Sequence, residues 1–234
     1  MMFTFKQFTI RQDACAMKVG TDGVLLGAWS PVDQATHILD IGTGTGLLAL
    51  MIAQRAPHAM IDAIEIDEKA LEQARHNVSL TSWSHRVHFF STSVQNFCTT
   101  VHRRYDAIVC NPPYFIDSLK SPNVCRTQAR HTDTLTHDDL LLAADRLLAE
   151  QGALNVILPA VEADVFIEKA KTYHFSLSKV THVLPTPTSL AKRRLMHFVR
   201  GASSLVETQL VIETNRHVYS DAYKMLTKDF YLKF

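Results

Sequence analysis

One tetrapeptide in this chain indicates chemistry directly: Asn111-Pro112-Pro113-Tyr114, which follows an apolar run at 105–110. The side-chain amide oxygen of Asn111 and the backbone carbonyl of Pro112 can each accept one N–H of a planar NH2 group. These two bonds make the nitrogen lone pair available for attack on an electrophilic methyl group, and positioning supplies much of the rate. The pattern therefore predicts a site that activates a planar amine, although the tetrapeptide alone also suits a strand ending in a Pro-Pro turn.

The same tetrapeptide is expected to be stiff before any ligand arrives. Proline fixes φ, and Asn111 is restricted to extended backbone because a proline follows it. Tyr114 offers an aromatic face on which a flat base can stack. A rigid pair of acceptors beside an aromatic ring suits a nucleobase amine.

A glycine-rich turn upstream predicts where the electrophile is held. Residues 38–41 suit a buried parallel strand, and residues 47–55 suit a helix with an apolar face. Between them, glycines at 42, 44 and 46 leave room for a ligand to approach the backbone at the helix N-terminus. The segment is therefore a strand, a ligand-binding turn and a helix.

A second strand, expected at 60–66, carries Glu65 near its end. A carboxylate in that place suits the two hydroxyls of a ribose. NAD enzymes space their glycines as G-x-G-x-x-G, whereas this chain has G-x-G-x-G, and its fourth strand ends in the Asn-Pro-Pro-Tyr tetrapeptide. Together these features favour S-adenosylmethionine over a dinucleotide.

The two motifs and Glu65 resemble the class I S-adenosylmethionine-dependent methyltransferases that act on amino groups. The N-terminal stretch 3–29 is similar to that of the bacterial tRNA(Val) adenine-37 N6-methyltransferases, and so is the ending 229–234. This resemblance runs the whole length of the chain. It implies S-adenosylmethionine as cofactor, S-adenosylhomocysteine as product, and N6 of adenine 37 in the anticodon loop of valine tRNA as the acceptor.

The resemblance also implies which residues form the site. The catalytic residues would be Asn111, Pro112 and Tyr114. The residues expected around the cofactor are Lys18, Thr21, Asp22, Asp40, Gly42, Gly44, Gly46, Glu65, Ile66, Ser93 and Asn111. For Thr21 and Asp22, a helix cap before the apolar run 24–26 is an alternative role that could coexist with ligand contact. Ser93 stands where related enzymes commonly carry an aspartate that contacts the cofactor adenine, so its hydroxyl or a backbone carbonyl would replace that carboxylate.

The residues expected to contact the substrate are Pro113, Tyr114, Arg126, Arg130, Lys192, Arg193 and Arg194. Arg126 and Arg130 belong to a polar stretch at 115–134, and loops that long inside a compact domain are usually functional or disordered. The basic triplet 192–194 begins an expected strand at 195–200 and could meet phosphates, with 103–104 as a second basic group. Solvated surface arginines and lysines are the alternative reading of these residues.

The order of expected strands and helices predicts an α/β fold. We expect a Rossmann-like class I methyltransferase with a central, mostly parallel seven-stranded sheet, helices on both faces and an antiparallel C-terminal strand. Residues 1–234 should form a single methyltransferase domain. Within it, 1–30 would cover the cofactor, 31–200 would be the cofactor-binding and catalytic core, and 201–234 would add a strand and a helix. Ligands bind at the carboxyl ends of such strands.

Charge is modest for a protein that binds nucleic acid, with a formal net charge of +1 over 234 residues. The basic residues gather toward one end, because residues 192–234 hold eight Lys/Arg against four Asp/Glu. A folded tRNA is also recognised by shape and by bases splayed out of its loops. A near-neutral chain can therefore still act on RNA.

Other patterns exclude several classes of protein. No apolar run reaches the roughly 18 residues of a membrane span, and the N-terminus lacks the pattern of a signal peptide, so we expect a cytoplasmic protein that does not enter membranes. Cysteines at 15, 98, 110 and 125 show no C-x-x-C spacing, and no H-E-x-x-H occurs, which predicts reduced thiols and no metal. Nothing indicates an obligate protein partner.

The tetrapeptide by itself leaves the acceptor open, because two acceptors suit any planar NH2. Protein-glutamine N5-methyltransferases, ribosomal RNA guanine N2-methyltransferases and DNA adenine methyltransferases use the same logic. The N-terminal stretches and the lack of a separate target-recognition domain favour RNA over DNA. A module that binds the cofactor without turnover is less consistent with the complete set of Asn111, Pro112 and Tyr114.

Overall fold

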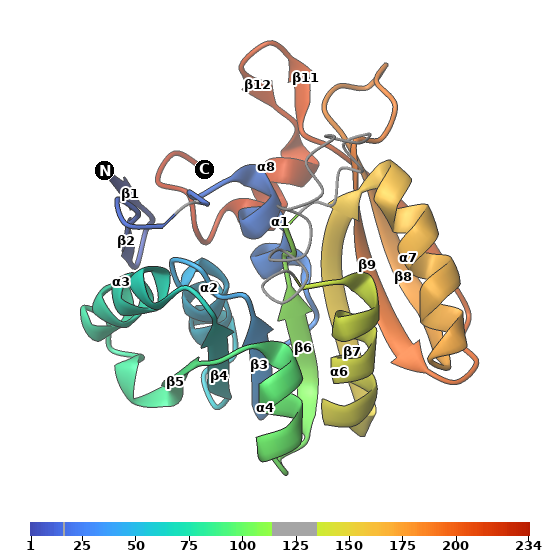
Figure 1. The fold of residues 1–234 in the computed structure, drawn as a ribbon. Coiled ribbons are helices and arrows are strands. Elements are labelled where there is room, and N and C mark those ends of the chain that lie inside the picture. Colours follow the sequence, from blue (N-terminus) through green and yellow to red (C-terminus); the bar gives the residue numbers. More distant parts are fainter. Residues whose placement is uncertain (16, 114–134) are drawn as a thin grey trace, which may run out of the picture.

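The computed structural model describes residues 1–15, 17–113 and 135–234, and its centre is a twisted eight-stranded sheet (Figure 1). The strand order is β10-β8-β9-β7-β6-β3-β4-β5. Its strands are β3 (His37–Ile41), β4 (Met60–Glu65), β5 (Val87–Ser91), β6 (Tyr105–Cys110), β7 (Leu148–Pro159), β8 (Phe175–Leu184), β9 (Arg193–Arg200) and β10 (Val206–Val211). All neighbours run parallel except β9, which is antiparallel to both β7 and β8.

The expected seven-stranded count was wrong by one strand. The strand expected in the C-terminal segment 201–234 is β10, which lies at the edge of the sheet and pairs with β8 in parallel rather than antiparallel. The antiparallel strand is β9, which precedes that segment. Strand patterns in a sequence mark extended segments, but the partner of an edge strand is chosen by packing.

Helices cover both faces of the sheet, and two buried clusters fill the space between. The helices are α1 (Thr21–Trp29), α2 (Leu47–Arg55), α3 (Glu68–Ser79), α4 (Val94–Thr100), α6 (His137–Leu147), α7 (Ala160–Thr172) and α8 (Asp221–Thr227). Residues of α1, α2 and α8 belong to one cluster, and residues of α4, α6 and α7 belong to the other. Strand β6 contributes to both, since Ala107 and Val109 face the first cluster and Ile108 and Cys110 the second.

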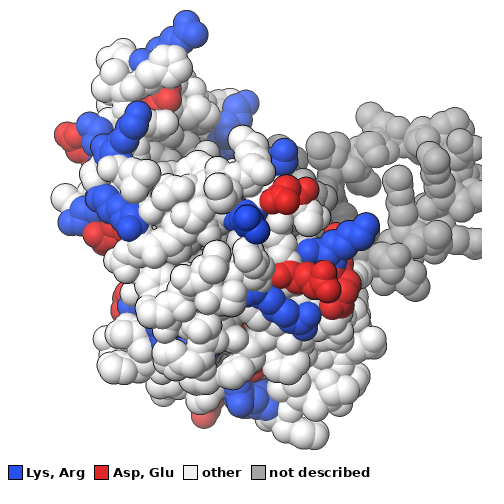
Figure 2. Space-filling model, turned by 90° about the vertical axis from the view of Figure 1, so that its left-hand side faces the viewer, with Lys and Arg blue, Asp and Glu red and all other residues white. Residues whose placement is uncertain are grey.

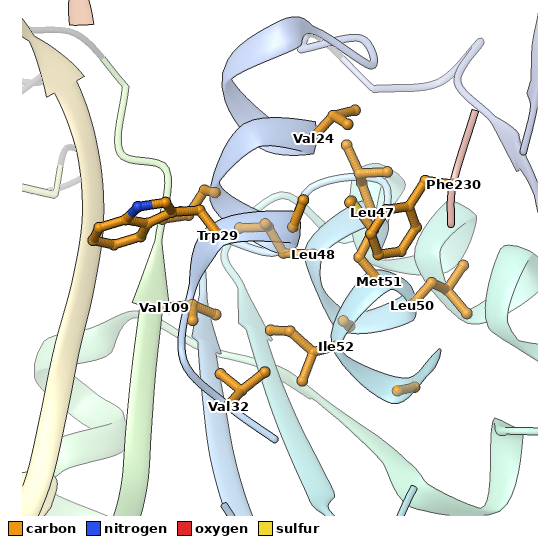
Figure 3. Close-up of a cluster of buried hydrophobic side chains, with 14 of the residues drawn as sticks. Val24, Trp29, Val32, Leu47, Leu48, Leu50, Met51, Ile52, Val109 and Phe230 are labelled. Carbon is orange, nitrogen blue, oxygen red and sulfur yellow. The ribbon is translucent and has the colours of Figure 1, made fainter. Parts of the chain in front are cut away.

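Helix α1 is buried along nearly its whole length and packs closely on α2. Figure 3 shows Val24 of α1 beside Leu47 and Met51 of α2, with Phe230 against them. The close approach requires Gly27, because a Cβ there would lie 2.7 Å from the sulfur of Met51. Arg86 stabilises the C-terminal end of α2. Its guanidinium donates hydrogen bonds to the carbonyls of Ala53, Ala56 and Ala59, at and just after the end of that helix.

The two ends of the chain lie together. The N-terminal hairpin of β1 (Met2–Thr4) and β2 (Thr9–Arg11) meets the C-terminal residues, where Lys6 N–H donates to the Phe230 carbonyl at 2.8 Å. Phe5 stacks on Tyr231 with ring centroids 5.9 Å apart. A second hairpin, β11 (Glu213–Asn215) and β12 (Val218–Tyr219), projects from the side toward which β4 and β6 point (Figure 1).

No helix in the described ranges combines the length and apolar composition that crossing a bilayer requires.

Candidate active site at the carboxyl edge of the sheet

The glycine-rich turn has the backbone shape that the sequence pattern predicts. Gly42, Gly44 and Gly46 have φ of 71°, 55° and 81°, which side chains other than glycine rarely adopt. The amides of Gly42 and Thr43 each donate to the carbonyl of Ile64 at 3.0 Å. The turn after β3 is therefore tied to the end of β4, where Glu65 follows.

Glu65 is held against this turn by backbone amides. Its Oε2 accepts from the Gly44 N–H at 2.9 Å, and its Oε1 accepts from Ile66 and Asp67 at 2.8 and 3.0 Å. A carboxylate has about four acceptor positions, so three bonds leave one position for a further hydroxyl donor. The three amides fix the direction in which that position points.

Asp40 lies beneath the turn with an exposed fraction of 0%. Its Oδ2 accepts from the Thr43 hydroxyl at 2.6 Å. Burial raises the pKa of Asp40 to about 7 and Glu65 adds to the rise, while the bonds from Thr43 and the Ala49 backbone oppose it. Its Oδ1 is buried and has no hydrogen-bond partner among the described residues. The contact expected between Asp40 and the cofactor stays a prediction.

A pocket opens beside Glu65, with about 380 Å³ of empty space including its open mouth. The ends of three neighbouring strands line it, together with the start of α4 and one residue before α6. The lining residues are Ile41, Gly42, Ile64, Glu65, Ile66, Thr92, Ser93, Val94, Gln95 and Leu135. The expected cofactor residues Gly42, Glu65, Ile66 and Ser93 are thus brought together.

Ser93 has a structural role at this pocket as well. Its hydroxyl accepts from Asn96 N–H at 3.2 Å and caps α4. The hydroxyl proton remains able to donate to a ligand. Sequence reasoning missed the other six lining residues, which are Ile41, Ile64, Thr92, Val94, Gln95 and Leu135. All but Leu135 stand at or just after the end of a strand, and that position was the signal that could have found them.

Asn111 stands at the end of β6 with an unused acceptor. Its Oδ1 is buried and has no hydrogen-bond partner among the described residues, whereas its Nδ2 donates to the Met17 sulfur at 3.9 Å. A buried carbonyl oxygen without a donor is costly, so such an atom marks a place where a ligand can donate. Pro112 is buried and Pro113 is exposed. Tyr114, Arg126 and Arg130 lie outside the described residues.

The start of α1 closes one side of Asn111. A Cβ on Gly23 would lie 4.0 Å from Asn111 Nδ2 and 3.0 Å from a Leu47 methyl group. The cap of this helix is Gly20, without a side-chain hydrogen bond, so the capping role expected for Thr21 or Asp22 was wrong. Thr21 and Lys18 are exposed nearby.

The basic triplet lies at the same edge, because Arg193 and Arg194 pair with the last residues of β7. Two of its three charges are already engaged: Arg193 Nε donates to Asp22 Oδ2 at 2.8 Å, and Arg194 forms an ion pair with Asp164. Lys192 is exposed. The triplet therefore offers less free charge than its composition indicates.

The second basic group lies at the opposite edge, where β6 begins. Arg103 pairs with buried Asp62 at 3.1 Å, and the Tyr105 hydroxyl donates to the same carboxylate oxygen at 2.6 Å. Figure 2 shows basic and acidic side chains interspersed with wide uncharged areas on the face it presents. That face therefore carries scattered charges of both signs and no continuous positive patch.

Residues 1–15, 17–113 and 135–234 contain no group of three or more His, Cys, Asp or Glu side chains placed to hold a metal ion. Cys15, Cys98 and Cys110 are free thiols. Burial raises the pKa of each of them, most strongly for Cys110.

Comparison with known proteins agrees with this geometry. The family model for the methyltransferase small domain matches residues 19–170. A protein of Flavobacterium psychrophilum is 48% identical over 99% of this chain and 100% of its own length, and one of Phocaeicola vulgatus is 50% identical over 98% and 97%. Both are named tRNA1(Val) (adenine(37)-N6)-methyltransferase.

Solved structures share the fold at low identity. A predicted O-methyltransferase from Agrobacterium tumefaciens superposes with a TM-score of 0.71 at 20% identity, covering 89% of this chain and 96% of that one. A putative RNA methyltransferase from Pyrococcus horikoshii gives 0.55 at 18% identity, covering 77% and 82%. With two nearly full-length relatives at about half identity and a matching domain model, the chain belongs to the family of tRNA1(Val) (adenine(37)-N6)-methyltransferases.

Proposed function

We propose that this chain transfers a methyl group from S-adenosylmethionine to the exocyclic N6 of adenine 37 in tRNA1(Val). The observation that carries this proposal is the buried Oδ1 of Asn111, which has no donor among the described residues. It stands at the same sheet edge as the glycine turn and Glu65. An acceptor placed there suits an amine donor.

The residues at this edge fit the cofactor. Glu65 keeps one acceptor position for a ribose hydroxyl, and the pocket between Ile66 and Ser93 offers apolar walls with a hydroxyl for an adenine. The glycines at 42, 44 and 46 leave space for close approach to the backbone. When bound, S-adenosylmethionine supplies a methyl group on a positively charged sulfur.

Asn111 and Pro112 prepare the acceptor nitrogen. Asn111 Oδ1 accepts one N–H of the N6 amine, and the Pro112 carbonyl accepts the other. The lone pair of N6 then points toward the methyl carbon, a new N–C bond forms, and the C–S bond breaks. The nitrogen becomes acidic as it gains positive charge, so its extra proton passes to water and no strong base is required.

The adenine reaches this site only after it leaves its stack, since chemistry on a base needs an exposed base. A tRNA loop permits this because its bases are already partly unstacked. Lys192 is the member of the basic triplet best placed to meet a phosphate, because it is exposed while Arg193 and Arg194 are paired. A tRNA substrate also implies that the protein acts in the cytoplasm.

Labelled methyl transfer into total tRNA that lacks this modification tests the proposal. The RNA is then digested to nucleosides and analysed by mass spectrometry. One new N6-methyladenosine peak is expected, and it should disappear with Asn111→Ala while binding of S-adenosylhomocysteine persists. No label in tRNA, with intact binding of S-adenosylhomocysteine, would reject tRNA as substrate and direct the same assay to protein glutamine and ribosomal RNA.

A further inference from the structure

The ion pair between Asp22 and Arg193 joins two segments that are 171 residues apart and meet beside Asn111. Asp22 lies in the first turn of α1, and Arg193 is the first residue of β9. Their side chains are only 19% and 29% exposed. A partly buried pair with one short bond at 2.8 Å holds its geometry better than a surface pair of solvated charges.

The opposite end of α1 is fixed independently. Trp29 Nε1 donates to the buried Thr181 hydroxyl of β8 at 2.8 Å, and Gly27 packs directly on Met51. Figure 3 shows the apolar contacts that hold the middle of the helix. Val24 of the first turn shares these contacts, and Asp22 lies on the N-terminal side of them, where Arg193 meets it.

The first turn of α1 also borders the catalytic amide. The Cβ position of Gly23 is 4.0 Å from Asn111 Nδ2, and the Met17 sulfur accepts from the same nitrogen. These neighbours confine the nitrogen side of the amide. Because the amide is rigid and planar, confining its nitrogen fixes the direction of Oδ1.

We propose that Arg193 is a positioning residue: its ion pair with Asp22 holds the first turn of α1 against Asn111 and thereby keeps Oδ1 aimed at the acceptor amine. The inference rests on the proposed function for what Oδ1 meets. It replaces the expected role of Arg193 as a phosphate contact. Arg193 then acts on turnover rather than on RNA affinity.

Steady-state kinetics separate the two roles. If Arg193 positions Asn111, Arg193→Ala should lower kcat roughly 10- to 100-fold, since a small misplacement of a catalytic group has that effect. The KM for tRNA and its dependence on salt should stay near the wild-type values. If Arg193 contacts a phosphate, KM should rise, and the slope of log KM against log salt should fall by about 0.7–0.9.

Further variants show what each outcome looks like when its cause is known. Lys192→Ala removes an exposed charge from the adjacent position and is expected to raise KM and flatten the salt slope. Arg146→Ala removes an exposed charge from the last turn of α6, at the opposite edge, and should change neither constant. Asp22→Asn should reproduce the kcat loss of Arg193→Ala, and the reversed pair Asp22→Arg with Arg193→Asp should regain at least part of it.

A second readout does not depend on the substrate. Hydrogen exchange of the free protein should speed up in the first turn of α1 with Arg193→Ala and Asp22→Asn, and slow again in the reversed pair. Affinity for S-adenosylhomocysteine should change less than about threefold in Arg193→Ala. A KM effect without a kcat effect, or unchanged exchange in α1, would overturn the proposal. Failure of tRNA as a substrate would appear instead as inactive wild-type protein with the exchange pattern intact.

Discussion

Asp40 makes the stability of the protein depend on pH in a direction opposite to that of most aspartates. Its pKa rises from 3.8 to about 7, chiefly because burial disfavours the charged carboxylate. The folded state therefore binds the proton more tightly than the unfolded state does. Stability from this group is fully present below pH 3.8 and is lost as pH rises through 7.

The size of the loss follows from the two pKa values. Between pH 5 and pH 8 the unfolded carboxylate is almost fully ionised, whereas the folded one changes from protonated to mostly ionised. Linkage then gives a loss of about 3 kcal/mol in the free energy of unfolding over this interval. Asp40→Asn cannot ionise, and its amide oxygen can still accept from the Thr43 hydroxyl.

Urea denaturation at half-unit steps from pH 5 to pH 8 measures this effect. The free energy of unfolding of the wild type, relative to Asp40→Asn, should fall by about 3 kcal/mol across the interval. Asp106→Asn is a matched control with the opposite shift: burial acts to raise the pKa of Asp106, but bonds from Thr36 and His37 lower it overall. Its difference from wild type should stay constant above pH 5. A constant difference for Asp40→Asn as well would refute the assignment.

Three further substitutions probe the site and its support. Asn111→Ala removes the unused acceptor and should lower kcat roughly 10²- to 10³-fold in the tRNA assay. The affinity for S-adenosylhomocysteine should stay within a few fold of the wild type, and a large loss of it would contradict the proposal that Asn111 acts on the acceptor amine rather than on the cofactor. Glu65→Gln replaces one carboxylate oxygen by a donor and should weaken S-adenosylhomocysteine about 10- to 100-fold by calorimetry, so an unchanged Kd would exclude Glu65 from the cofactor site. Arg86→Met removes the guanidinium donors from the carbonyls of Ala53, Ala56 and Ala59, of which Ala56 keeps the bond from the Ala59 N–H, and should cost about 2–4 kcal/mol in urea denaturation. Arg75→Met breaks an exposed pair with Glu68 and should cost about 0.5 kcal/mol; equal costs would count against the proposed support of α2.

Local sequence predicted the parts of the site that short segments form alone. The glycine turn was predictable because φ values of 55° to 81° are open to glycine and closed to most other residues. The place of Asn111 was predictable because an apolar run followed by Pro-Pro ends a strand, and parallel strands end at one edge. Helices α3 and α6 likewise begin directly after Asp67 and Thr136, whose side chains cap them and belong to the residue types that favour this position.

The predictions that depended on distant partners were the ones that the structure corrected. Asp40 belongs to the motif, but only the folded structure shows that its side chain is fully buried and that one of its two carboxylate oxygens has a partner. The triplet 192–194 reads as free charge until Asp22 and Asp164 are placed beside it. The strand expected in 201–234 pairs in parallel with β8, and the antiparallel strand of the sheet is β9.

The sequence by itself indicated the chemistry, because the acceptor amide, the glycine turn and the carboxylate proposed to bind a ribose each lie within a few adjacent residues. Tertiary structure decided which of these groups are left without an internal partner and can therefore meet a ligand. The surrounding residues leave the Oδ1 of Asn111 buried without a donor and raise the pKa of Asp40 by burying it. They also place Asp22 where it pairs with the guanidinium of Arg193. Availability depends on burial and on partners tens to hundreds of residues away, and no local pattern encodes those contacts.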